Sequence, residues 1–212
     1  MKSLTTAVPG SATSAISCNE LRTEIARQGK RLQVVVATAH DPDGVEVARA
    51  TALRFRLGVG PDSPTDPRLP AIVTPPWGPA RVHERRSDNL NGFIDAAEMR
   101  EGGSSDAATT WYRATKPVIA GEEPSPTVRL AWASDFTANS GNYLDLRRWS
   151  AINADLTITL ARAPRGEWTG VATRAWYALD GIGHARADLF DRDGFVGTCT
   201  ASLLVDEVAA PY

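Results

Sequence analysis

The chain has 212 residues, of which 42% are hydrophobic and 23% charged, and its formal net charge is -2. This balance argues against a nucleic-acid partner, which requires clustered Lys and Arg side chains. No apolar run approaches the ~18 residues that a membrane span needs, and no apolar stretch of signal-peptide type follows Lys2. We therefore expect a globular, cytoplasmic protein whose two cysteines are buried free thiols rather than a disulfide pair.

The N-terminal quarter of the chain is predicted to consist mainly of strands. Residues 1–15 are small and polar and predict a poorly ordered start, and residues 16–26 are strand-like. Residues 32–39 and 45–57 are rich in β-branched and alternating apolar side chains, the composition of half-buried strands. Between them, Asp41-Pro-Asp-Gly44 predicts a hairpin turn in which glycine supplies the positive φ.

A proline-rich stretch divides the chain. Seven prolines fall between Gly58 and Arg81, and this density removes backbone donors and prevents a regular helix or sheet. We interpret residues 58–91 as a linker. Residues 1–57 then form an N-terminal module, and residues 92–212 form a C-terminal module.

The C-terminal module is predicted to contain strands, one helix and then more strands. Ser125 and Pro126 predict the helix start, because serine caps an N-terminus and proline suits the first helical position. Gly141 is a natural stop, so we expect a helix over residues 126–139, packed on a sheet built from both modules. The segments that predict strands are 92–100, 107–115, 156–160, 168–176, 185–190 and 196–205.

Two turn motifs of the same form suggest that the modules are related. Asp41-Pro-Asp-Gly44 and Asp191-Arg-Asp-Gly194 lie 150 positions apart, and each joins two β-rich segments. The modules are unequal, however. The second has strands and a helix before its closing strands, whereas the first has only the closing strands.

Asp135 is the leading candidate for chemistry, because it is an aspartate within an apolar helical segment. It is either a solvated residue on the outer face or a carboxylate held against the sheet. The second arrangement suits a general base that activates water. Asn153 and Asp155 precede a strand and can equally cap a turn. Ser202 lies in the last strand, where an ordinary strand hydroxyl is the simpler interpretation.

Other catalytic classes lack support in the sequence. The three histidines are far apart and show no metal-ligand spacing. No Gly-x-Ser-x-Gly elbow and no glycine-rich phosphate loop is present. We therefore expect no metal site, no serine hydrolase and no nucleotide-dependent enzyme.

Three strings of residues resemble the acyl-CoA thioesterase II family of double hotdog proteins. Trp132-Ala-Ser-Asp-Phe136 is similar to the family's helix motif, which carries its active-site aspartate. Residues 153–164, followed by Glu167-Trp168, are similar to the strand after that helix, and residues 183–194 are similar to the closing hairpin. Together they cover about residues 92–206, and residues 27–54 similarly resemble the end of the first hotdog.

The resemblance implies an α+β double hotdog fold, in which a curved antiparallel sheet wraps around a helix and the first hotdog is incomplete. It implies an acyl-CoA substrate and no cofactor. In the family, an aspartate, a threonine or similar polar residue and a glutamine orient the water that attacks the thioester. Asp135 matches the aspartate, and Asn153 stands at the threonine position. The glutamine is expected near Ala201 and Ser202, and Ser202 can replace it if the register shifts by one residue.

Two departures from the family leave an alternative open. No glutamine stands near Ala201, and the first module lacks its front strands and its helix. Unpaired strand edges favour pairing with another chain, so we expect a homo-oligomer. The alternative to an active thioesterase is a catalytically degenerate hotdog protein that binds acyl groups or serves as an assembly subunit.

Overall fold

The computed structural model describes residues 20–58, 96–102, 109–119, 121–140, 144–145 and 148–208. The chain divides into two compact units, Met1–Thr65 and Asp66–Tyr212, and each is considered by itself. The predicted polar start, the predicted linker beyond Gly58, and the residues Cys18 and Gly141 lie outside the described residues. The limits of the two predicted modules therefore stay predictions. No helix in the described ranges has the length and hydrophobicity required to cross a bilayer.

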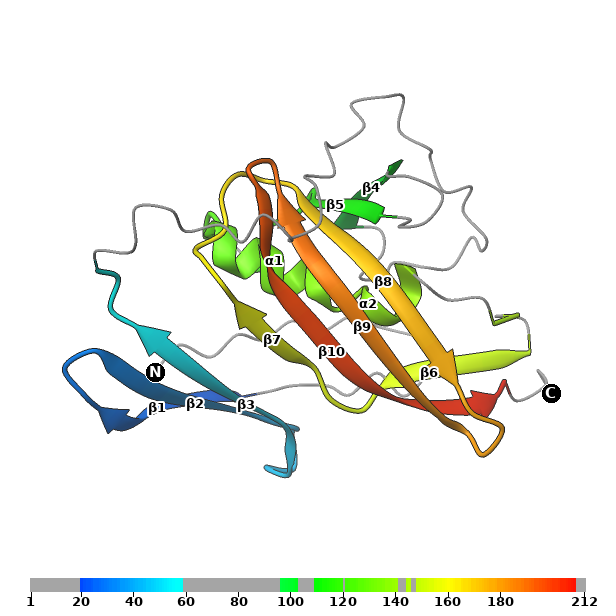
Figure 1. Cartoon of the computed structure of the whole chain (residues 1–212). Helices are drawn as coiled ribbons and strands as arrows, with labels where there is room; N and C mark the ends of the chain where they lie inside the picture. The colour runs from blue at the N-terminus through cyan, green and yellow to red at the C-terminus, as the bar shows by residue number, and fades with distance from the viewer. Residues whose placement is uncertain are drawn as a thin grey trace. The chain divides into compact units, whose positions relative to one another are not determined.

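The first unit contains a three-stranded antiparallel sheet (Figure 1). Its strands are β1 (Glu20–Gln28), β2 (Leu32–His40) and β3 (Glu46–Phe55), in the spatial order β1-β2-β3. These are the three predicted strands, and the first of them ends at Gln28, two residues later than predicted. β1 is exposed along its whole length, and no helix occurs within residues 20–58.

The second unit contains a seven-stranded antiparallel sheet. Six strands follow the order β4-β5-β8-β9-β10-β6, and β7 pairs with the N-terminal half of β10. The strands are β4 (Ala97–Gly102), β5 (Thr109–Ala114), β6 (Trp149–Asn153), β7 (Thr157–Leu160), β8 (Thr169–Tyr177), β9 (Ile182–Asp191) and β10 (Gly194–Glu207). All seven strands come from residues 97–207, and the expectation that the first module also contributes to the sheet under the helix stays a prediction.

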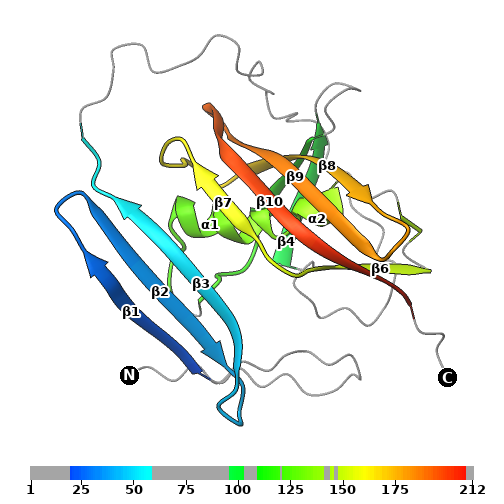
Figure 2. The ribbon, with the colours of Figure 1, turned by 60° about the horizontal axis from the view of Figure 1, so that its bottom comes forward.

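Two short helices lie on one side of this sheet (Figures 1 and 2). They are α1 (Pro126–Ser134) and α2 (Thr137–Ser140). The predicted start is confirmed, because the Ser125 hydroxyl accepts a hydrogen bond from the N–H of Val128 at 3.3 Å and Pro126 opens α1. The prediction of one continuous helix is wrong at one point, since a turn at Asp135 and Phe136 separates α1 from α2, although Asp135 itself keeps helical φ and ψ angles.

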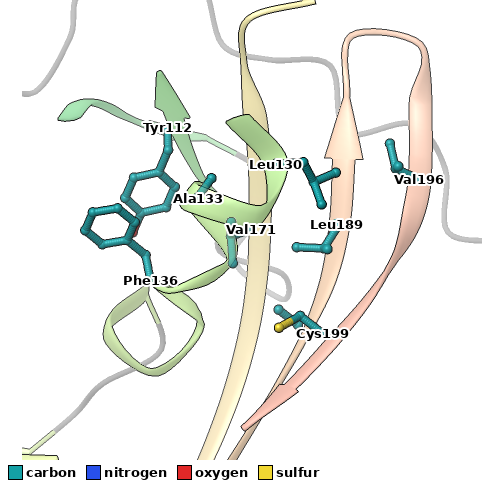
Figure 3. Close-up of a cluster of buried hydrophobic side chains, with 9 residues drawn as sticks. Tyr112, Leu130, Ala133, Phe136, Val171, Leu189, Val196 and Cys199 are labelled. Carbon is teal, nitrogen blue, oxygen red and sulfur yellow. The ribbon is translucent and has the colours of Figure 1, made fainter. Parts of the chain in front are cut away.

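Packing around Phe136 accounts for the interruption between the helices. The Phe136 N–H donates to the carbonyl of Ala133 at 3.1 Å, which is the tighter i to i−3 pattern. Its ring is buried and stacks on Tyr112 of β5, with centroids 4.3 Å apart. Figure 3 shows these two rings together in the cluster that also contains Leu130, Val171 and Leu189. Burial of each such side chain stabilises the fold by about 1.5–3 kcal/mol.

Both aspartate–glycine turn motifs form hairpins, and their first aspartates act in the same way. Asp41 Oδ1 accepts the N–H of Asp43 at 3.0 Å, and Asp191 Oδ1 accepts the N–H of Asp193 at 2.8 Å. Gly44 has φ 82° and Gly194 has φ 110°, a region that favours glycine. The turns therefore match in sequence and in hydrogen bonding, as the repeat predicted.

Asp191 additionally anchors a buried ion pair. Its two carboxylate oxygens accept bonds from Arg162 at 2.6 and 2.7 Å, and one of them accepts the N–H of Arg165 at 2.8 Å. Burial alone raises the pKa of Asp191, but the hydrogen bonds from Arg162, Asp193 and Arg165 outweigh it and hold the pKa below its ordinary value. This cluster joins the segment after β7 to the β9–β10 hairpin.

Gly197 lets β7 approach β10 closely. A β-carbon at this position would lie 2.1 Å from the backbone carbonyl oxygen of Thr159 on β7. The β9–β10 register also shifts between Phe195 and Gly197, which marks a β-bulge. Any side chain at residue 197 would therefore push β7 off the sheet.

Candidate active site

Asp135 occupies the C-terminal cap of α1 and is exposed. This is an unusual place for an acidic residue, because the C-terminal end of a helix carries partial negative charge and favours cations. No basic residue is present in the last turn of α1 to compensate. An aspartate that violates a local stability preference in this way is a candidate for a functional role.

The side chain of Asn153 reaches Asp135 from the end of β6. Asn153 Nδ2 lies 3.2 Å from Asp135 Oδ1 and 3.2 Å from the Asp135 backbone oxygen, so that one amide group donates to both. No other described residue binds the Asp135 carboxylate, and its Oδ2 is therefore open. The structure thus brings two of the three predicted site residues together.

The other end of the Asn153 amide has no partner among the described residues. Asn153 Oδ1 is buried and accepts no hydrogen bond. Reversing the amide would place this oxygen against two oxygens of Asp135, so the orientation is fixed by the contact. A buried acceptor without a donor is costly and is commonly satisfied by water or a ligand.

Ser202 lies on the opposite face of the sheet from this pair. On β10, Ala201 and Leu203 are buried in the cluster that contains Ala138 of α2, whereas Ser202 between them is exposed. The register shift in the β9–β10 pairing lies at Phe195–Gly197 and not at Ser202. The shift by one residue that would turn the Ser202 hydroxyl toward Asp135 is therefore not observed.

Asp155 holds the backbone beside the site. Its Oδ1 accepts the N–H of Ser202 at 2.6 Å, while the Ala154 N–H donates to the Ser202 carbonyl at 2.9 Å. The hydrogen bond from the Ser202 backbone lowers the pKa of Asp155. Asp155 thus caps the turn between β6 and β7, which is one of the two interpretations that the sequence left open, and it fixes the position of Asn153.

Ala201 and Cys199 close the core beneath the site. Ala201 is 1% exposed and packs with Ala138 and Ala185, so it supplies no polar group. Cys199 is fully buried, with its sulfur 4.0 Å from the Ser134 carbonyl oxygen. Burial raises the pKa of this thiol. Its place in the apolar cluster is that of a small core side chain, as the sequence predicted for a free cysteine.

β6 is the element of the site that the sequence prediction missed. Trp149, Ala151 and Asn153 face the helices, and Leu203 of β10 pairs with Asn153. Only one of its five residues is β-branched, so the composition signal for a strand is weak. The sequence analysis therefore identified Asn153, the last residue of β6, only as a polar residue before the next strand.

Comparison with known proteins identifies a family and a fold. The family described as "Acyl-CoA thioesterase C-terminal domain" matches residues 60–205 of the chain. No curated protein matches the sequence.

Several solved structures resemble the chain along most of its length. An acyl-CoA thioesterase II, TesB2, from Mycobacterium marinum is 16% identical, with a TM-score of 0.62 over 91% of this chain and 75% of its own. A hot dog fold protein from Alicyclobacillus acidocaldarius is 18% identical, with a TM-score of 0.65 over 91% of this chain and 73% of its own. A thioesterase-like protein from Novosphingobium aromaticivorans is 19% identical, with a TM-score of 0.60 over 87% of this chain and 71% of its own. At these identities the similarity shows the fold, and the predicted α+β hotdog fold is confirmed.

Proposed function

The chain belongs to the acyl-CoA thioesterase C-terminal domain family, and from this premise we propose that it hydrolyses an acyl-CoA thioester with water activated by Asp135. The observation that carries the proposal is the contact between Asn153 and Asp135. It orients the carboxylate through Oδ1 and leaves Oδ2 free for a water molecule. A carboxylate fixed in this way suits general base catalysis.

The chemistry that we propose needs one water and no cofactor. The water oxygen attacks the thioester carbonyl carbon while Asp135 Oδ2 accepts one of its protons. The tetrahedral intermediate then collapses, the carbon–sulfur bond breaks, and the proton passes to the leaving thiolate. The products are a free acid and the thiol of CoA. Asn153 takes part through Nδ2, which holds Asp135 Oδ1 in place while Oδ2 takes the proton.

In the site that we propose, Asn153 takes the place of the family's threonine. By its resemblance to the family, Asn153 occupies the position of a threonine or similar polar residue. The two hydrogen bonds from Asn153 Nδ2 support its assignment as the residue that positions Asp135. Ser202 is not included in the proposed mechanism, since its side chain projects from the other face of the sheet. Cytoplasmic location and a role in fatty acid metabolism stay expectations that follow from the proposed substrate.

A catalytically degenerate protein is the second candidate, and one observation favours it. The family's glutamine is expected near Ala201, which is a buried alanine in this chain. The site then holds two polar side chains in place of three. Such a protein would bind an acyl group, or assemble with other chains, without turnover.

Release of free thiol from short, medium and long acyl-CoA distinguishes the two candidates. Hydrolysis of at least one chain length above the rate in buffer is expected for the thioesterase. Binding of acyl-CoA by calorimetry without thiol release would instead identify the degenerate protein. Absence of both would exclude the thioesterase and the acyl-binding protein, and would leave the assembly subunit as the form of the second candidate.

A further inference from the structure

The exposed face of α1 is uncharged up to Asp135. Leu130 and Ala133 of this helix are buried in the core of the second unit (Figure 3). The exposed residues within α1 are Thr127, Val128 and Ala131, none of which is charged. The outer face of a surface helix normally carries charged and polar side chains. The composition of α1 therefore favours an apolar ligand on this face over open solvent.

Asp135 and Val128 lie one above the other on the exposed face. They are seven residues apart, which is close to two helical turns, and Asp135 keeps helical φ and ψ angles as the C-terminal cap. Trp132 lies between them and is half-buried, with its ring centroid 5.4 Å from that of Phe136. A ligand that is held at Asp135 can therefore continue along α1 for about 10 Å, past uncharged side chains, before it reaches Val128.

A pocket lies at the N-terminal end of this path. Val128 lines it together with Val118 and Ile119 of the segment before α1, and its volume is about 220 Å³. The three apolar side chains are 38%, 45% and 39% exposed, respectively. Glu122 and Glu123 also line the pocket, and their carboxylates disfavour an anionic ligand. The lining therefore suits the uncharged end of an apolar chain.

We propose that the acyl chain of the thioester lies along the exposed face of α1 and that its last carbons enter the pocket at Val118, Ile119 and Val128. The inference rests on the proposed function, because it takes the thioester carbonyl to lie at Asp135. An extended alkyl chain advances about 1.3 Å per carbon, so the ~10 Å between Asp135 and Val128 correspond to roughly eight carbons. A chain of about ten carbons then reaches into the pocket, whereas a chain of about four ends beside Trp132. This site selects acyl chains of medium length.

Binding of thioethers tests the path without turnover. S-decyl-CoA and S-butyl-CoA cannot be hydrolysed. Calorimetry with the full chain should show at least about tenfold tighter binding of the decyl compound, because each methylene that leaves water strengthens binding. Val128→Glu should remove most of this difference and leave the affinity for S-butyl-CoA unchanged, since the butyl chain ends before residue 128. Leu179→Glu is the matched control, because Leu179 is fully exposed in the turn between β8 and β9.

Filling the pocket is the second test, and it predicts a change of preference rather than a loss of binding. Ile119→Trp should weaken binding of S-decyl-CoA several-fold and leave the affinity for S-hexyl-CoA at the wild-type level, because only the longer chain enters the pocket. Leu179→Trp should keep the wild-type preference. Circular dichroism confirms that each variant is folded.

Two results would overturn the inference. One is a wild type that binds the decyl and butyl compounds equally, as expected if the first unit or another chain covers α1. The other is a preference for the decyl compound that Val128→Glu and Ile119→Trp leave intact. Thiol release without the expected binding pattern would refute the acyl path and leave the proposed hydrolysis standing. The binding pattern without thiol release would refute the hydrolysis and leave the acyl path standing.

Discussion

Asn153 Nδ2 donates to Asp135 Oδ1 across 3.2 Å, and the two residues are 18 positions apart in the sequence. One residue ends β6 and the other ends α1, so this contact joins the sheet edge to the helix terminus. Each partner compensates for a local cost. The donor offsets negative charge at the end of α1, and the carboxylate satisfies an amide that would otherwise be half-buried without a partner.

Replacing Asp135 by Asn separates catalysis from stability. We expect kcat for acyl-CoA hydrolysis to fall about 100-fold or more, the usual effect of losing a positioned base, with little change in KM. The melting temperature should stay constant or rise by about 1–4 °C, because a negative charge leaves the C-terminus of α1. Thiol-release kinetics and thermal unfolding provide the two readouts. Turnover unaffected by the substitution would refute the assignment of Asp135.

Replacing Asn153 tests its role as a positioning residue. Asn153→Ala removes the donor to Asp135 Oδ1 and should lower kcat by roughly tenfold, within the range for an oriented catalytic group. Asn153→Thr keeps a hydroxyl donor at the family position and should retain more of the activity than the alanine variant. Steady-state kinetics of both variants, with folding checked by circular dichroism, measure the difference. Equal activity in the two variants would indicate that the amide only supports the fold.

The Arg162–Asp191 pair should make the second unit sensitive to acid. The folded pKa of Asp191 is lowered, so its stabilising contribution is present above its unfolded pKa of about 3.9 and is lost as the pH falls through the folded value. At neutral pH, Asp191→Asn should lower the melting temperature by about 4–8 °C. The difference from the wild type should shrink below about pH 4. Asp193→Asn is the control, because Asp193 is 39% exposed and its ion pair with Arg165 is long, at 3.4 Å.

Substitution of Gly197 tests the close approach of β7 to β10. Gly197→Ala places a methyl group 2.1 Å from the Thr159 carbonyl oxygen, so β7 must move. We expect the melting temperature to fall by roughly 5–10 °C, the effect of a backbone shift of this kind. Gly58→Ala is the matched control, because the nearest atom to its added carbon is 3.9 Å away, on the Arg31 guanidinium. Equal melting temperatures for the two variants would contradict the packing of β7.

Local features of the fold were correctly predicted because their causes are local. Ser125 and Pro126 determine the start of α1 through a cap and a fixed φ, both of which act within one turn of chain. The Asp41 and Asp191 turns depend on a carboxylate that binds the N–H two residues later and on a glycine with positive φ. The residue strings that resemble the thioesterase family likewise identified its fold, and the structural similarities confirm it.

The sequence by itself determined which residues were candidates for the site, and only the tertiary structure decided which of them meet. Asp135 and Asn153 come together because β6 pairs with β10 in one register, and that register depends on contacts between distant segments. The same alternation turns Ser202 to the other face and Ala201 into the core. The turn that separates α1 from α2 lies at Asp135 and Phe136, where Phe136 stacks on the distant Tyr112. Side-chain partners across a sheet are set by non-local pairing, which local sequence patterns do not encode.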